Sequence, residues 1–314
     1  MPTLRVGVIG PAGFGGSYLC VELLNRGHTV IGISRKPQAL GKHERYIPRP
    51  VDIDQVSIEQ LAENFNDLDV LVSEYGPHTA GHMALLYMPF VETVRKLILA
   101  YKRSSASYFV FVGGAGSLHV PGTPDCCVDH PDFFLAYRRA ISTSLAHIAY
   151  MEERLGIMGT ALRAYREARL ASDAGKATDA DRQVIQGYEG NVEKKDDASD
   201  FIKAGRTAFM FFDGNESFRW SFVSPSALYR PGKRTGKYEI SIDDMVLQGE
   251  QKKGESIFEG RLTGISVADM AIAIADEVEK QKLVYKHWSA SGDISEDVPA
   301  PAYMTLEAVE EGSA

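Results

Sequence analysis

The chain has 314 residues, of which 44% are hydrophobic and 24% charged, a composition ordinary for a folded globular protein. A net charge of −8 and the lack of any Lys- or Arg-rich stripe argue against nucleic acid as a partner. Three cysteines are too few for a disulfide framework, and no apolar run approaches the roughly 18 residues of a membrane-spanning helix. We therefore expect a cytoplasmic protein with a small-molecule partner and no membrane partner.

The first part of the chain has the pattern strand, turn, helix, strand within about thirty residues. Residues 4–9 and 28–33 are short apolar runs, and residues 14–26 between them have helical spacing of their apolar side chains. Further apolar runs predict strands at 51–53, 69–73, 108–112 and 220–223. Helices are predicted at 89–102, 199–212 and 267–281, and Ser57 opens another with capping-box spacing to Gln60.

Apolar strands that alternate with helices predict an α/β fold with a doubly wound, Rossmann-type parallel sheet covered on both faces. We expect a core at 1–124, a mostly helical insertion at 125–198, the end of the core with a small substrate-binding part at 199–287, and an acidic tail at 288–314. The insertion would be a lid over the substrate or an arm of a homo-oligomer. Its polar end, residues 171–200, is predicted to be a mobile surface excursion, and the Pro-rich stretch from Val298 a poorly ordered tail.

A glycine-rich turn joins the first strand to the first helix. Three glycines of this turn have separate roles. Gly10 permits the tight turn, Gly13 lets a diphosphate approach the backbone, and Gly16 lets the helix pack closely on the strand. The helix N-terminus adds partial positive charge. In this setting the turn predicts a dinucleotide site, with Ala12, Phe14 and Gly15 completing it, although a glycine turn without a ligand is the alternative.

The residues after the second strand favour NADPH as the cofactor. An acidic side chain there would bind the ribose of NAD, but the strand ends in Ser34, Arg35 and Lys36. Two cations and a hydroxyl suit a 2′-phosphate, which Arg can bind with two hydrogen bonds. A solvated basic loop is the alternative. Asp52, after the third strand, is placed to meet the adenine amino group or is a simple turn residue.

Several motifs together resemble a known family. They are VGVIGPAG (6–13), GHTVIGISR (27–35), DVLVSEYGP (69–77), FVGGAGSL (111–118), WSFVSPS (220–226), PGKRTGKY (231–238) and ISVADMA (265–271). In order and number they resemble the atypical short-chain dehydrogenase/reductase group of NmrA-like and NADH-flavin-reductase-like NAD(P)-binding proteins. Residues 125–198 are not covered by this resemblance.

The resemblance implies roles for the matched positions. The turn with Tyr75, Gly76 and Pro77 would line the adenosine ribose, Gly113 and Gly114 the nicotinamide ribose, and Ser224 with Pro225 the carboxamide end. The loop 227–235 would cover the substrate.

Two departures from the family pattern stand close to the cofactor. Pro11 and Ala12 replace the usual Ala and Thr of the first turn, which removes a backbone donor and a hydroxyl. Glu74 stands where a small residue is usual and brings a carboxylate near the cofactor path.

No complete catalytic apparatus is evident. Carbonyl reduction typically uses a Tyr and a Lys one helical turn apart, but the spacing of Tyr229 and Lys233 encloses Pro and Gly and predicts a loop. The candidates are Ser117 as a donor, Lys203 on the helix that has Ser199 at the tyrosine position, and Tyr229. The alternatives are a turn-capping serine, a solvated lysine and a packed tyrosine.

No metal site is predicted, because the His and Cys residues at 119–130 lack the spacing of zinc ligands. The sequence thus favours an NADPH-dependent reductase of a small or medium aromatic or conjugated carbonyl, a quinone or a flavin-like substrate. A non-catalytic NADPH-binding redox sensor and a redox-neutral isomerase or dehydratase are the alternatives.

Overall fold

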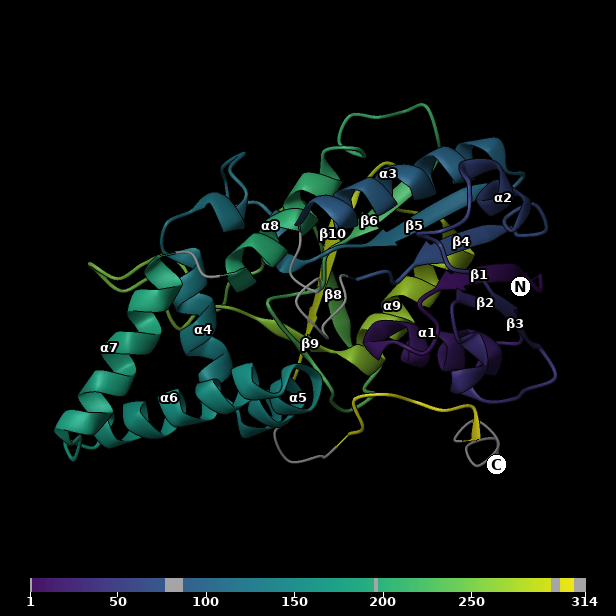
Figure 1. Ribbon diagram of the computed structural model, residues 1–314. Helices are drawn as coiled ribbons and strands as arrows, with labels where there is room; N and C mark the ends of the chain where they lie inside the picture. The colour runs from purple at the N-terminus through teal and green to yellow at the C-terminus, as the bar shows by residue number, and fades with distance from the viewer. Residues whose placement is uncertain (1, 77–86, 195–196, 295–299, 308–314) are drawn as a thin grey trace.

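The computed structural model describes residues 2–76, 87–194, 197–294 and 300–307 (Figure 1). Its first unit consists of β1 (Arg5–Ile9), α1 (Phe14–Asn25) and β2 (Thr29–Ser34), in agreement with the sequence pattern. The two strands pair in parallel along their whole length. Their central residues are buried on both faces, which is why the strands are apolar runs rather than alternating ones.

The strands form one sheet in the order β3-β2-β1-β4-β5-β6-β10-β9-β7, with β8 beside β10. From β3 to β10 all neighbours pair in parallel. The chain order reverses between β1 and β4, and folds of this kind bind ligands at the carboxyl ends of such strands. The predicted Rossmann-type sheet is confirmed. The other strands are β3 (Tyr46–Pro50), β4 (Val70–Ser73), β5 (Tyr108–Val112), β6 (Trp220–Val223), β7 (Leu228–Arg230), β8 (Tyr238–Ile242), β9 (Gly264–Ser266) and β10 (His287–Gly292).

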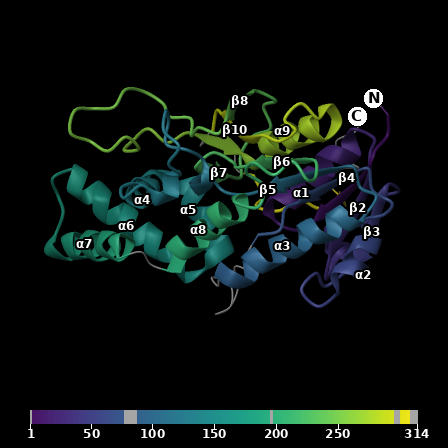
Figure 2. The same cartoon turned by 90° about the horizontal axis from the view of Figure 1, so that it is seen from above.

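Helices cover both faces of the sheet (Figures 1 and 2). One layer contains α1 and α9 (Val267–Lys280), and the other contains α2 (Ile58–Glu63), α3 (Tyr87–Arg103) and α8 (Asp197–Phe209). In β4, Val70 and Val72 pack with the first layer, whereas Leu71 between them packs with the second. The capping box is present, since Ser57 Oγ accepts from Gln60 N and Gln60 Oε1 accepts from Ser57 N.

The third strand lies at Tyr46–Pro50, and its prediction at 51–53 was wrong. Pro48 and Pro50 disguise the strand, because proline cannot donate to a sheet ladder and is tolerated at a sheet edge. β3 is such an edge, since it pairs with β2 alone. Asp52 still follows the third strand.

The segment from 133 to 193 consists of consecutive helices joined by short links and lies at the end of the molecule opposite β3 (Figures 1 and 2). It comprises α4 (Phe133–Thr143), α5 (Leu145–Leu155), α6 (Ile157–Asp173) and α7 (Asp179–Glu193). The prediction of a mobile excursion at 171–200 was wrong for α7. Thr178 and Asp181 cap this helix, and Tyr188 stacks on Tyr165 of α6 with ring centroids 4.2 Å apart.

The end of the chain is also part of the fold, and the prediction of an acidic tail from 288 was wrong. Trp288 lies in β10, is fully buried, and its Nε1 donates to Ser221 Oγ at 2.7 Å. Beyond the sheet, Leu306 is fully buried and its backbone N donates to Leu40 O at 2.8 Å. The prediction of a poorly ordered tail is thus wrong for residues 300–307. A few apolar side chains, among them Ala302 and Leu306, decide the packing there.

Candidate functional site

The glycine turn has the geometry of a dinucleotide site. Gly10 has φ +79°, a conformation that L side chains rarely adopt, and Gly13 is the N-cap of α1. A Cβ on Gly16 would lie 2.1 Å from Gly10 O, so only glycine lets the helix approach the strand this closely. The first turn of α1 contains no acidic residue, and its first N–H groups have no carbonyl partner within the helix. These residues fit a bound diphosphate.

The residues predicted for the adenosine end lie close together. Arg35 and Lys36 are exposed after β2. Burial raises the pKa of Tyr75, and the charges of Arg35 and Asp52 act on the same hydroxyl in opposite directions. The Tyr75 ring stacks on Phe90 with centroids 5.8 Å apart. Gly76 is exposed, and Pro77 lies outside the described residues.

Glu74 points inward, toward the glycine turn. A Cβ on Gly15 would lie 2.4 Å from Glu74 Oε2, so the carboxyl occupies the space beside the first turn of α1. Burial raises the pKa of Glu74 to about 8. The structure therefore places this carboxyl beside the turn that is predicted to hold the cofactor.

A chain of hydrogen bonds lies under the loop after β5. Ser117 Oγ donates to Gly114 O at 2.7 Å and lies 2.8 Å from Ser224 Oγ, which is 2.9 Å from His287 Nε2. Because the Ser117 proton is used by the carbonyl, Ser224 donates to Ser117 and His287 Nε2 donates to Ser224. Burial lowers the pKa of His287 to about 3, so the ring is neutral, and its Nδ1 is 3.8 Å from Asp243 Oδ1.

This arrangement bears on two predicted roles. The hydroxyl of Ser117 is fully buried and serves the loop, as its turn-capping alternative required. Donation from Ser117 to a substrate stays a prediction. Ser224 and Pro225 are buried at the end of β6, and a Cβ on Gly113 would lie 2.3 Å from the Phe222 ring, so this loop lies directly on β6.

Tyr229 and Lys203 lie on different sides of the sheet. The Tyr229 ring packs against Phe14, with centroids 5.0 Å apart, on the side of α1. Lys203 is half-buried on α8, which packs against α3 on the other face. The ring centroids of Tyr150 in α5 and of Phe14 lie 4.5 Å apart, so the helical segment reaches the glycine turn. The sequence analysis missed Tyr150, because nothing local marks it.

A cavity of about 890 Å³ lies between the helical segment and the strands β7, β8 and β9. His147 of α5 and Arg230 of β7 are both buried in its wall. Burial, followed by the charge of Arg230, lowers the pKa of His147 to about 3, so this ring is neutral. His147 was not predicted for the site. Arg230 falls within the loop 227–235 that was expected to cover the substrate, but it belongs to the strand β7, and only the docking of α5 on β7 brings the two residues together.

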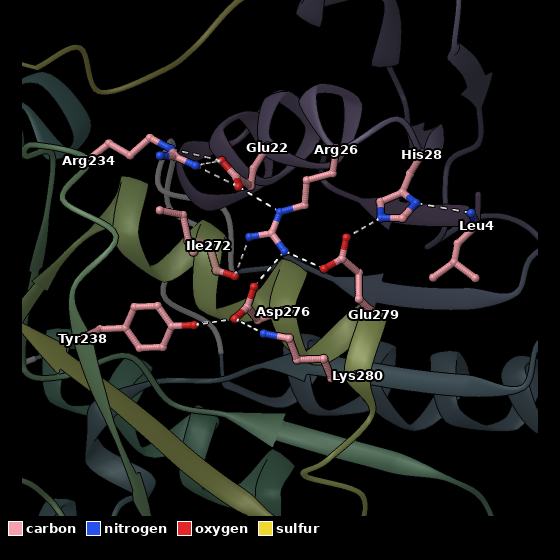
Figure 3. Close-up of polar contacts among 10 residues, drawn as sticks. All are labelled: Leu4, Glu22, Arg26, His28, Arg234, Tyr238, Ile272, Asp276, Glu279 and Lys280. Atoms are coloured by element: carbon pink, nitrogen blue, oxygen red, sulfur yellow. Dashed lines mark hydrogen bonds and ion pairs between the residues drawn. The ribbon is translucent and has the colours of Figure 1, made fainter. Parts of the chain in front are cut away.

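An ionic cluster fixes the other end of α1 (Figure 3). Arg26 is 2.9 Å from Glu22 and 2.7 Å from both Asp276 and Glu279 of α9. Burial alone would lower the pKa of Arg26, but the hydrogen bonds and charges of these carboxylates raise it. Arg234, in the loop after β7, is 3.1 Å from Glu22. The helix that begins at the glycine turn is thus tied to α9 and to the loop predicted to cover the substrate.

Known protein sequences are similar to this chain, over part of it or over most of it. Residues 10–155 match the NAD(P)H-binding family. The uncharacterised protein YwnB of Bacillus subtilis is 24% identical over 278 residues, which cover 88% of this chain and 92% of YwnB.

Two solved structures have a similar fold. A candidate epimerase from Bacteroides thetaiotaomicron has a TM-score of 0.59 and 23% identity, and covers 92% of this chain and 97% of its own. A candidate NADH-flavin reductase from Streptococcus pneumoniae has a TM-score of 0.58 and 18% identity, and covers 92% and 100%.

The fold and the glycine turn define a Rossmann-fold protein that binds a nicotinamide dinucleotide. The NAD(P)H-binding family matched by residues 10–155 agrees with the resemblance inferred from the motifs. Among the described residues, no helix combines the length and the apolar character needed to cross a membrane.

Proposed function

We propose that the protein is an NADPH-dependent reductase of a small or medium aromatic or conjugated carbonyl, a quinone or a flavin-like compound. The observation that carries the choice of cofactor is the exposed pair Arg35 and Lys36 directly after β2. Neither forms an ion pair with any residue that the structure describes. Both are available for a 2′-phosphate, and the residues that directly follow β2 include no carboxylate that would repel it.

The cofactor would extend along the carboxyl ends of the strands. The glycine turn would hold its diphosphate, Ser34 with Arg35 its 2′-phosphate, and Asp52 with Tyr75 its adenosine. Gly113 and Gly114 would lie beside the nicotinamide ribose, with Ser224 and Pro225 at the carboxamide. The bound nicotinamide supplies the hydride, and the chain supplies placement and exclusion of water.

The aromatic rings of Phe14, Tyr150 and Tyr229 support an aromatic or conjugated substrate. They pack together beside the start of α1, where the nicotinamide half of a cofactor would begin. The cavity behind them, with His147 in its wall, has the volume of a small-molecule site. Three free, buried cysteines suit the reducing cytoplasm, where NADPH is available.

A redox sensor is the second candidate, and a specific observation favours it. The hydroxyl proton of Ser117 is used by Gly114 O, and Tyr229 and Lys203 lie on opposite sides of the sheet. A protein that binds NADPH without a proton donor would report the redox state to a partner instead of turning over. The name of the epimerase neighbour keeps a redox-neutral reaction as a third possibility.

Calorimetric titration with NADPH and NADH tests the choice of cofactor. We expect Arg35→Ala to weaken NADPH binding by about tenfold or more and to leave NADH binding within about twofold, because a charged hydrogen bond to phosphate is lost. Arg95→Ala, an exposed arginine on α3 paired with Glu92, is the control. Equal or tighter binding of NADH by the wild-type protein would contradict the assignment of NADPH as the cofactor.

Turnover separates the reductase from the sensor. Purified protein with NADPH is offered quinones, flavin and aromatic ketones, and oxidation of the nicotinamide is followed by absorbance. A reductase oxidises NADPH with at least one class of acceptor. Tight binding of NADPH without turnover on any acceptor would favour the sensor.

A further inference from the structure

Glu74 occupies an unusual position beside the glycine turn. Its backbone N donates to Ile9 O at 3.0 Å and so extends the pairing of β4 with β1 by one residue. This places the side chain at the carboxyl edge of the sheet. A Cβ on Gly15 would lie within 3.1 Å of both carboxyl oxygens, and one on Gly10 would lie 3.1 Å from Glu74 O. The carboxyl group thus stands at the first turn of α1, where a diphosphate binds in this fold.

Within residues 2–76, 87–194, 197–294 and 300–307, no hydrogen bond or ion pair stabilises the charge of this carboxyl. Glu74 Oε1 is buried and has no hydrogen-bond partner within the described residues. The turn and β1 contribute no ionisable side chain to its surroundings. On α1, burial and then the charge of Glu74 raise the pKa of Cys20 well above its usual value, so this thiol is neutral. Burial raises the pKa of Glu74 itself to about 8, which means that the neutral acid prevails at pH 7.

The turn is short of hydrogen-bond donors. Pro11 has no backbone N–H, and Ala12 has no hydroxyl. A protonated carboxyl has one O–H donor, whereas an ionised carboxylate only accepts. Beside a diphosphate in a buried site, an ionised Glu74 would repel the ligand, and a protonated one would donate to it.

We propose that Glu74 binds the diphosphate of the cofactor as a protonated acid, so that the affinity for the dinucleotide is coupled to the protonation of this side chain. The coupling rests on the binding of a nicotinamide dinucleotide. It does not depend on which dinucleotide is preferred or on turnover.

The direction of the pH dependence follows from linkage. The negative diphosphate raises the pKa of Glu74 further in the complex, so binding takes up a proton wherever the free protein has lost it. The dissociation constant is therefore nearly constant below pH 7 and rises with pH above about 8. Between pH 7 and pH 9 we expect a loss of about tenfold in affinity, with uptake of close to one proton at pH 9.

Calorimetric titration at pH 7, 8 and 9 tests the coupling, with NADPH and NADH each as ligand and without any acceptor. Proton uptake is obtained from titrations in two buffers of different ionisation enthalpy. Adenosine 2′,5′-bisphosphate, which has no diphosphate, serves as a comparison ligand and is expected to bind without this pH dependence.

Two variants identify the titrating group. Glu74→Gln keeps the shape and a donor but cannot ionise, and it is expected to bind the dinucleotide at pH 9 as well as at pH 7. Cys20→Ala is the matched control, because it removes the one titratable group on α1 that Glu74 affects, and it is expected to keep the wild-type pH dependence.

The wild-type measurement decides the question even if a variant does not fold. Constant wild-type affinity from pH 7 to pH 9 without proton uptake would overturn the proposal, as would the same pH dependence in Glu74→Gln. A preference for NADH would contradict the assignment of NADPH and leave this coupling intact.

Discussion

Arg26 in α1 and Arg139 in α4 each lie between carboxylates, but they connect different kinds of partners. Arg26 is 19% exposed and bonds to Asp276 and Glu279, some 250 residues further along the chain. Arg139 is 31% exposed and bonds to Glu189, 50 residues away, and to Glu259, at 3.0 and 3.2 Å. Arg26 ties α1 to α9 on one face of the sheet. Arg139 ties α4 to α7 within the helical segment and also to Glu259, in the loop before β9.

The two regions that contain these arginines are packed in different ways. In the nucleotide-binding half, the helices pack on a parallel sheet whose strands are buried on both faces. Removal of one buried contact is therefore expected to lower the stability of the whole half. In the helical segment, smaller clusters such as that of Ile141, Ile148, Leu162 and Tyr165 hold neighbouring helices. We expect the segment to loosen without unfolding the sheet.

The largest effect is expected from Trp288→Ala, in the interior strand β10. The side chain is fully buried, and its loss leaves a cavity and an unpaired Ser221 hydroxyl, at a cost of about 4 kcal/mol in the free energy of unfolding. Urea denaturation measures it. Tyr303→Ala, 40% exposed within the same C-terminal stretch, is the control and is expected to change stability by less than about 0.5 kcal/mol. A similar loss in the free energy of unfolding for both variants would contradict the role of β10 as a buried interior strand of the sheet.

Arg26→Met is expected to have the next largest effect. It leaves the carboxylates of Glu22 and Glu279, whose side chains are 8% and 6% exposed, without their shared cation. We expect a loss of about 2–3 kcal/mol, again by urea denaturation. Arg95→Met removes an exposed pair with Glu92 and is expected to be nearly neutral. A neutral Arg26→Met would show that the clamp between α1 and α9 adds nothing to the apolar packing beneath it.

Arg139→Met is expected to have the smallest effect, about 1 kcal/mol, because its pairs are closer to solvent. Its consequence should be local. Amide hydrogen exchange is expected to quicken in α7 and at the end of α4, and to stay unchanged in β1 and β4. Faster exchange in the sheet would mean that the two regions unfold as one unit and would remove the distinction drawn between them.

The residues of the candidate site also differ in how far the sequence predicted them. The glycine turn, Arg35 and Tyr75 were predicted for the site because each follows closely on an apolar strand, and the ends of parallel strands meet at one edge. Asp52 was predicted as well, although the strand before it was misplaced at 51–53. Tyr150, His147 and His287 were not predicted, because their neighbours in the structure are distant in the chain. Glu74 stands between these cases: its place near the cofactor was anticipated, and its inward direction and lack of a partner were not.

The sequence by itself determined the βαβ start, the parallel sheet and the dinucleotide turn, because glycine conformation and strand burial are local or periodic properties of the chain. Tertiary structure decided the rest. Residues 179–193 look solvated yet form a docked helix, and residues 288–292, which were predicted to begin the tail, lie in the interior strand β10. It also decided the protonation of Glu74, because a carboxyl changes its pKa according to what surrounds it.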